Sequence, residues 1–129
     1  MIYLELLAAF VLGGSAYGAI ELAWRGRTHW TMLITGGLCF MCMYLIAANG
    51  SLGRLQQYIL CAVLITAVEF TVGAIVNVAL GWDVWDYSAQ PLNLYGQICA
   101  GYTALWFLLS IPGCALARFL RESIFRGSL

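Results

Sequence analysis

The fold is decided by residues 58–80, which read YILCAVLITAVEFTVGAIVNVAL. This run contains one charged side chain, Glu69, and it reaches the roughly 20 apolar residues that an α-helix needs to cross a bilayer. Barrel strands instead alternate polar and apolar residues over about ten positions. Because unpaired backbone amides are costly in hydrocarbon, the run predicts a transmembrane helix.

Similar apolar runs fill the rest of the chain. The 129 residues are 63% hydrophobic and 9% charged, whereas soluble domains are about 45–50% apolar and about 25% charged. We therefore predict an all-α fold, a single polytopic membrane domain over residues 1–129 built as a bundle of four transmembrane helices. The predicted helices are 2–24, 30–48, 58–80 and 94–120, with a polar and aromatic loop at 81–93. A faint similarity between residues 18–20 and 73–75 raises the hypothesis of two repeated two-helix units.

The distribution of arginine predicts the orientation. The net charge is zero, and no basic run could follow a phosphate backbone, so the expected surroundings are a lipid bilayer and not nucleic acid. With four spans, the side that holds both termini carries four arginines and the other side two: Arg54, Arg118, Arg121 and Arg126 against Arg25 and Arg27. The positive-inside rule then places both termini in the cytoplasm of a multi-pass plasma-membrane protein. The excess is only two arginines, so insertion of the chain in both orientations stays open as an alternative.

Glu69 is the strongest candidate for a functional residue, because a charge at the bilayer centre costs about 2.5–3.5 kcal/mol and rarely faces lipid. Thr66, Glu69, Gly73 and Asn77 follow one another at spacings of three and four, which places them on one helical face. This face is expected to look inward. Glu69 could bind a cation or exchange a proton there, or it could serve packing as a neutral carboxyl that donates one interhelical hydrogen bond.

The first span carries a comparable stripe. Gly14, Gly18, Glu21 and Arg25 are spaced by four, three and four residues, so the glycines can pack directly against another helix. Glu21 can line the same site as Glu69, or simply pair with Arg25 at i,i+4. Glu5 is expected to reach the interface by snorkelling. Its position inside the first apolar run, without a positive flank, predicts a permanent span and not a cleaved leader.

The loop at 81–93 invites two interpretations. As a structural turn, Asp86 satisfies loop amides and Asn93 caps the fourth helix, while Trp82 and Trp85 lie in the interfacial aromatic belt. If the loop instead dips into the membrane, its carboxylates and the N-terminus of the fourth helix could reach the Glu69 site from outside.

No motif predicts catalysis, a metal or a cofactor. The spacing Cys39-x-x-Cys42 is a weak signal, since zinc usually takes four ligands and the only histidine, His29, lies in the preceding loop. All five cysteines are interpreted as small packing residues. No phosphate-binding loop is present in the sequence, so the chain is not expected to be an enzyme or to hydrolyse a nucleotide.

A longer ordered string carries a family resemblance. It comprises Trp85-Asp86-Tyr87-Ser88, Pro91, Asn93, Gly96-Gln97-Ile98-Cys99 and Trp106, with Glu69 and Gly73 before it and, more loosely, residues 17–21 and Arg25-Gly26. In these residues the chain resembles the CmpB-like, putative ABC-transporter type IV family of small bacterial membrane proteins. The resemblance implies a four-helix membrane fold and a permease component, without a substrate.

Together these features predict a membrane transport or permease protein, a homo-oligomer that binds an unknown small molecule or ion and works with a separate ATP-hydrolysing subunit. Two alternatives stay open. The chain could be a non-transporting accessory or assembly protein, or a proton-coupled small exporter that acts as a homodimer.

Overall fold

The computed structural model describes residues 2–125, and the predicted Arg126 contribution to orientation lies outside them. Within these described residues, four helices are long and apolar enough to cross a membrane. They are α1 (Ile2–Arg25), α2 (Trp30–Ala47), α3 (Arg54–Gly73) and α4 (Ala100–Phe119); the π-helical segments η1 (Ala74–Ala79) and η2 (Leu120–Ile124) prolong α3 and α4. The prediction of an all-α, multi-pass membrane protein built as a four-helix bundle is confirmed.

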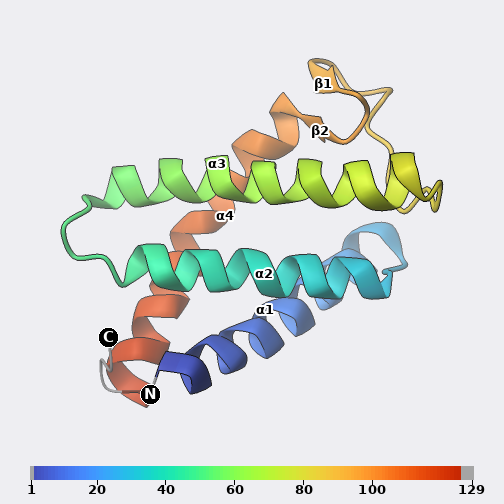
Figure 1. Cartoon of the computed structure of the whole chain (residues 1–129). Coiled ribbons are helices and arrows are strands. Elements are labelled where there is room, and N and C mark those ends of the chain that lie inside the picture. The colour runs from blue at the N-terminus through green and yellow to red at the C-terminus, as the bar shows by residue number, and fades with distance from the viewer. Residues whose placement is uncertain (1, 126–129) are drawn as a thin grey trace.

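Helix α2 lies at the centre of the bundle. It packs against α1, α3 and α4, and α3 packs in turn against α4 (Figure 1). A core at one end of the bundle includes Tyr44, Ile65, Cys61 and Cys114, and both Ile2 and Phe125 pack against it. The first and last described residues therefore lie at the same end, as an even number of spans requires.

Glycines hold α1 against α2. A Cβ added at Gly14 would lie 2.7 Å from the carbonyl oxygen of Leu33, and one at Gly37 would lie 2.8 Å from that of Phe10. Gly18 is also buried, against the Leu33 side chain. The Gly14 and Gly18 stripe therefore packs directly on α2, as predicted, and at Gly14 the two backbones meet because no side chain separates them.

Two predicted helix starts are wrong. The third helix begins at Arg54 instead of residue 58, because the Gln56 side chain accepts a hydrogen bond from the Gly53 amide at 2.9 Å and opens the helix earlier. The fourth begins at Ala100 instead of residue 94. Before it, β1 (Asn93–Leu94) pairs with β2 (Ile98–Cys99) as an antiparallel hairpin, whose turn residues have positive φ and so cannot be helical.

The two loop tryptophans have different surroundings. Trp82 is exposed and lies beside the rings of His29 and Trp30, as expected for an interfacial belt. Trp85, by contrast, is 4% exposed and packs in a second core with Met32 and Val76. The interfacial prediction is wrong for Trp85, because its ring fills the space beside Gly73 at the end of the bundle.

The glycine seam predicts the outcome of a matched pair of substitutions. Gly14→Ala should lower the free energy of unfolding by about 1–3 kcal/mol, since the new methyl group would clash with the α2 backbone. Gly101→Ala, where no atom lies within 4 Å, should leave stability unchanged or raise it by about 1 kcal/mol. Unfolding in denaturing detergent, followed by circular dichroism, measures both. Equal effects of the two substitutions would contradict this packing.

Candidate functional site

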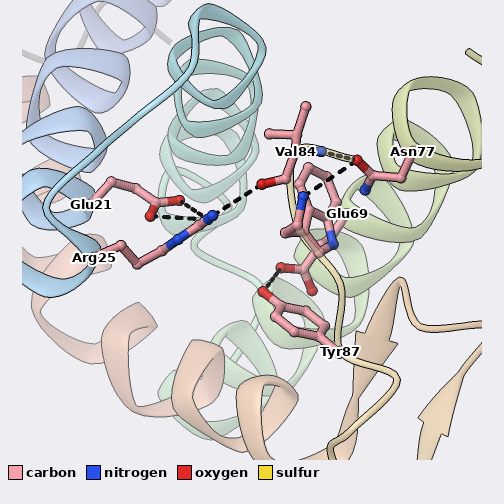
Figure 2. A network of polar contacts seen from close by, with 7 residues as sticks. Glu21, Arg25, Glu69, Asn77, Val84 and Tyr87 are labelled. Atoms are coloured by element: carbon pink, nitrogen blue, oxygen red, sulfur yellow. Dashed lines mark hydrogen bonds and ion pairs between the residues drawn. The ribbon is translucent and has the colours of Figure 1, made fainter. Parts of the chain in front are cut away.

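Glu69 faces the interior of the bundle, as predicted. It lies in the middle of the span Arg54–Ala79, and 3% of its surface is exposed. Its carboxyl accepts a hydrogen bond from the Tyr87 hydroxyl at 3.2 Å and one from Trp106 Nε1 at 3.4 Å. Figure 2 shows the Tyr87 ring reaching the carboxyl from the loop. The acid therefore has donors from α4 and from the loop instead of facing lipid.

Tyr87 is the loop residue that sequence reasoning missed. It belongs to the string that carries the family resemblance, but its role depends on the loop folding back over the bundle. Burial, followed by the neighbouring carboxyl of Glu69, raises the pKa of the Tyr87 phenol well above its usual range. Its hydroxyl therefore stays protonated and can donate to Glu69 at any physiological pH.

Asn77 holds the loop in place. Its Oδ1 accepts hydrogen bonds from the Val84 amide at 2.6 Å (Figure 2) and from the Trp85 amide at 3.4 Å. Its Nδ2 donates to Gln97 Oε1 at 2.8 Å. The backbone carbonyl of Gln97 in turn accepts a hydrogen bond from Trp85 Nε1 at 3.0 Å. One amide side chain in the π-helical η1 segment thus joins the loop to the hairpin.

Gly73 makes this closure possible. A Cβ at that position would lie 2.5 Å from Gln97 Oε1 and 3.0 Å from the Trp85 ring. Gly73 was predicted to serve helix packing, and the segments that pack closely against it are the loop and the hairpin. Thr66, one turn before Glu69, is hydrogen-bonded to Thr103 of α4 at 3.0 Å, so the whole predicted stripe on α3 meets partners within the protein.

Glu21 and Arg25 form the predicted i,i+4 pair on α1. Arg25 Nη1 lies 3.4 Å from Glu21 Oε2, and Arg25 Nη2 donates to the Val84 carbonyl at 3.0 Å. Glu21 is buried, with 5% of its surface exposed. The pair therefore fastens the end of α1 to the same loop residue that Asn77 holds from the other side (Figure 2).

Asp86 and Asn93 serve the loop itself. Asp86 is exposed, and hydrogen bonds from Ser88 lower the pKa of its carboxyl. Asn93 does not cap α4, whose N-cap is Cys99. Its side chain instead accepts a hydrogen bond from the Gly96 amide at 3.0 Å and donates to the Gln90 carbonyl at 2.9 Å. The cap prediction is wrong because the hairpin separates Asn93 from the helix.

Two adjoining cavities lie beside Glu69. An apolar cavity of about 240 Å³ has walls from α1 and α4 and a floor from α2 and α3, and among residues 2–125 Glu69 is the only charged residue that lines it. A cavity of about 570 Å³ towards the loop is more polar and includes Glu21, Arg25 and Tyr87. Tyr17 and Trp106 line both. Since Glu69 is bonded to Trp106 and Tyr87, its carboxyl lies where the two cavities meet.

Glu5 is a third buried acid, and its predicted position at the interface is wrong. It does not snorkel to the interface: its surface is fully buried, and it accepts a hydrogen bond from the Tyr44 hydroxyl of α2. The signal that could have found it is the spacing of Glu5, Ala9 and Gly13, which puts the acid on the small-residue face that α1 buries.

The cysteines are free thiols in the described part of the chain. Cys61 Sγ of α3 lies 3.6 Å from Cys114 Sγ of α4, while Cys39 and Cys42 are partly buried on α2. Within residues 2–125 no group of three or more His, Cys, Asp or Glu side chains could hold a metal ion. His29 accepts a bond from the Thr31 amide and caps α2.

A family model described as "Putative ABC-transporter type IV" matches residues 17–126, most of the chain. The chain belongs to this family. The match includes Glu21, Glu69, Asn77 and the whole loop, whereas Glu5 lies before it. Neither a curated protein nor a solved structure matches the chain. The description of the ABC-transporter type IV family relates the chain to membrane transport and names no substrate.

Loss of the Asn77 side chain should release the loop. Asn77→Ala leaves the Val84 amide without its 2.6 Å acceptor, and an unsatisfied buried donor costs about 1–3 kcal/mol. Hydrogen exchange, read by mass spectrometry on peptides covering 82–90, should become at least several-fold faster. Asn49→Ala, which removes an exposed loop contact to Ser51, is the control and should leave those peptides unchanged. Unchanged exchange in both variants would contradict the role of Asn77.

Proposed function

We propose that this protein is the membrane-spanning, permease-like part of a transport system, and that Glu69 is the polar group of its binding site. One observation carries the proposal: Glu69 lies within a membrane span and lines an apolar cavity, while its hydrogen-bond donors Tyr87 and Trp106 line an adjoining polar one. Intramembrane acids that face a cavity typically mark the path of a substrate or ion. The protein has no catalytic role in this proposal.

The comparison with Glu5 supports a binding role over a packing role. Glu5 is fully enclosed in the core and bonded to Tyr44, whereas Glu69 borders open volume and has only long hydrogen bonds, 3.2 and 3.4 Å. An ionised carboxyl offers about four acceptor positions. Glu69 therefore retains capacity for a further donor, such as a bound ligand or a proton.

The family and the charge distribution support the remaining parts of the proposal. An ABC-transporter relative without a phosphate-binding loop needs a separate ATP-hydrolysing subunit. The excess of arginine at the end with both termini supports cytoplasmic ends in the plasma membrane. Association into a homo-oligomer would enlarge the small volume that four helices enclose.

Two other functions have specific support. The glycine seam of α1 and α2 fits an accessory or assembly protein, in which small residues serve helix association alone. The one acid that lines the apolar cavity in the described part of the chain, and the excess of only two arginines, fit a proton-coupled exporter that works as a homodimer. The two experiments below separate these from the permease.

An apolar carbodiimide tests whether Glu69 borders an open cavity. Dicyclohexylcarbodiimide enters the membrane and adds to a protonated carboxyl, which gives a stable acylurea detectable by peptide mass spectrometry. Glu69 should be modified in the folded protein, because the apolar cavity admits the reagent. Glu5 should not react, because its surface is fully buried in the core.

Matched variants make the result interpretable. Glu69→Gln should abolish the modification, and Glu5→Gln should leave it in place. Unfolding in dodecyl sulfate should make both acids reactive in the unmodified chain. If Glu69 stays unreactive when folded, the acid is a packing device and the accessory function is favoured.

Reporter fusions test the orientation. A fluorescent protein that matures only in the cytoplasm should be bright when fused after Leu129, and dark when inserted after Gln90 in the loop. Alkaline phosphatase, which is active only outside the cytoplasm, should give the opposite pattern. Comparable signals from both reporters at one position would show dual insertion and favour the homodimeric exporter.

A further inference from the structure

The electrostatics around Glu69 favour a positive ligand. Among the residues that the structure describes, no arginine forms an ion pair with Glu69, since Arg25 is held by Glu21 and the Val84 carbonyl. The adjoining polar cavity is lined by three acids and two arginines: Glu21, Asp83 and Asp86 with Arg25 and Arg27. A cavity with an excess of acid attracts cations and raises their local concentration.

Aromatic rings surround the same junction. The rings of Tyr17 and Trp106 lie 5.8 Å apart between centroids, and those of Tyr87 and Tyr102 are stacked at 4.7 Å. All four residues line the polar cavity, and Tyr17 and Trp106 also line the apolar one. Ring faces attract ammonium groups, and the attraction is strongest where water is excluded. A carboxyl with rings on several sides is thus suited to an organic cation.

The apolar cavity sets the shape of the ligand. Below Glu69 its lining is Phe40, Met43 and other apolar side chains, and it extends between α1 and α4 as far as Leu116. A small inorganic cation would leave this volume empty. Because Ile20 and Leu116 on its walls are themselves about half exposed, the cavity opens along the α1 and α4 seam, towards the lipid.

Building on the proposed function, we propose that the ligand of the Glu69 site is a lipophilic organic cation. Its ammonium group binds between Glu69 and the rings of Tyr17 and Trp106, and its apolar body fills the cavity between α1 and α4. Such a molecule partitions into the membrane and reaches the site through the lipid-facing opening. Hydrogen-bond donors are unnecessary, so a quaternary ammonium is bound as well as a primary amine.

The test uses three probes of one shape and different charge. Benzyltrimethylammonium is the cation, neopentylbenzene its uncharged carbon isostere, and phenylmethanesulfonate an anion of similar size. Binding to the full chain in phosphatidylcholine nanodiscs is measured by titration calorimetry. The cation should bind at least about tenfold more tightly than either other probe, as expected for an interaction with a buried charge.

Variants assign the binding to the site. Glu69→Gln should weaken cation binding by at least about tenfold, and Trp106→Leu should weaken it severalfold through loss of the ring. Glu5→Gln and Trp82→Leu, which change an acid and a ring away from the cavities, should bind as the unmodified chain does. If Glu69→Gln fails to fold, as judged by circular dichroism, the two tryptophan variants provide the test. Weaker cation binding by Trp106→Leu but not by Trp82→Leu then assigns the ligand to the Glu69 site.

The pH dependence gives an independent readout. The titratable or charged groups that face Glu69 are Tyr17 and Glu21 on α1, Cys39 on α2 and Tyr87 in the loop. The probe itself does not titrate, so affinity should rise with pH as the Glu69 carboxyl ionises. This rise should vanish in Glu69→Gln.

Several results would overturn the inference. Equal affinity for the uncharged isostere would mean that the cavity takes an acyl chain or a second copy of this chain. Tighter binding of the anion, or no binding of any probe, would exclude a cation site. If Glu69 still reacts with the carbodiimide in that case, the proposed function stands and only the ligand class is wrong. If the protein shows no preference for the cation and Glu69 also fails to react with the carbodiimide, the proposed binding site itself is wrong.

Discussion

A carboxyl group in the middle of a hydrocarbon layer must find its partners inside the protein, and much of this structure follows from that requirement. The donors to Glu69 are Tyr87 and Trp106, one from a loop and one from α4. For Tyr87 to reach the acid, the loop has to fold back over the end of α3. Gly73 leaves room for the loop, and Asn77 binds its backbone amides. One buried acid thus accounts for the arrangement of a whole end of the bundle.

Glu5 and Glu69 are both buried almost completely, but their surroundings differ. Glu5 is enclosed in a packed core and bonded to Tyr44, at the end where the first and last described residues lie. Glu69 lines the apolar cavity, and its donors Tyr87 and Trp106 line the adjoining polar one. The family match includes Glu69 and begins after Glu5. The enclosed acid therefore lies on the part of α1 that precedes the family match, and the cavity-lining acid lies on α3, within the match.

The cavity is a consequence of how the helices share their contacts. Close glycine packing draws α1 onto α2, and α4 packs on α2 and α3. This arrangement leaves the apolar cavity between α1 and α4. At the loop end, Arg25 joins α1 to the Val84 carbonyl and so forms part of the wall of the polar cavity. The apolar cavity thus lies directly beside the glycine-packed helix pair.

The sequence by itself determined the number of spans, their approximate limits and the faces that turn inward. These are local properties: a run of apolar residues is long enough for a membrane, and spacings of three and four place Glu69 with Asn77, or Glu21 with Arg25, on one helical face. The Glu21 and Arg25 pair could be predicted because both partners lie on one helix, one turn apart.

Only the tertiary structure determined which residues those helix faces contact. Residues 94–99 were predicted to start a helix, but with Asn93 they form a hairpin, in which Gln97 bonds to Asn77 and Trp85. These are contacts between segments distant in sequence. The turn also needs positive φ at Tyr95, a residue type that rarely signals it. The contact of Tyr87 with Glu69 likewise joins a loop to a helix. Such pairings depend on how the elements pack, and no periodicity within one helix encodes them.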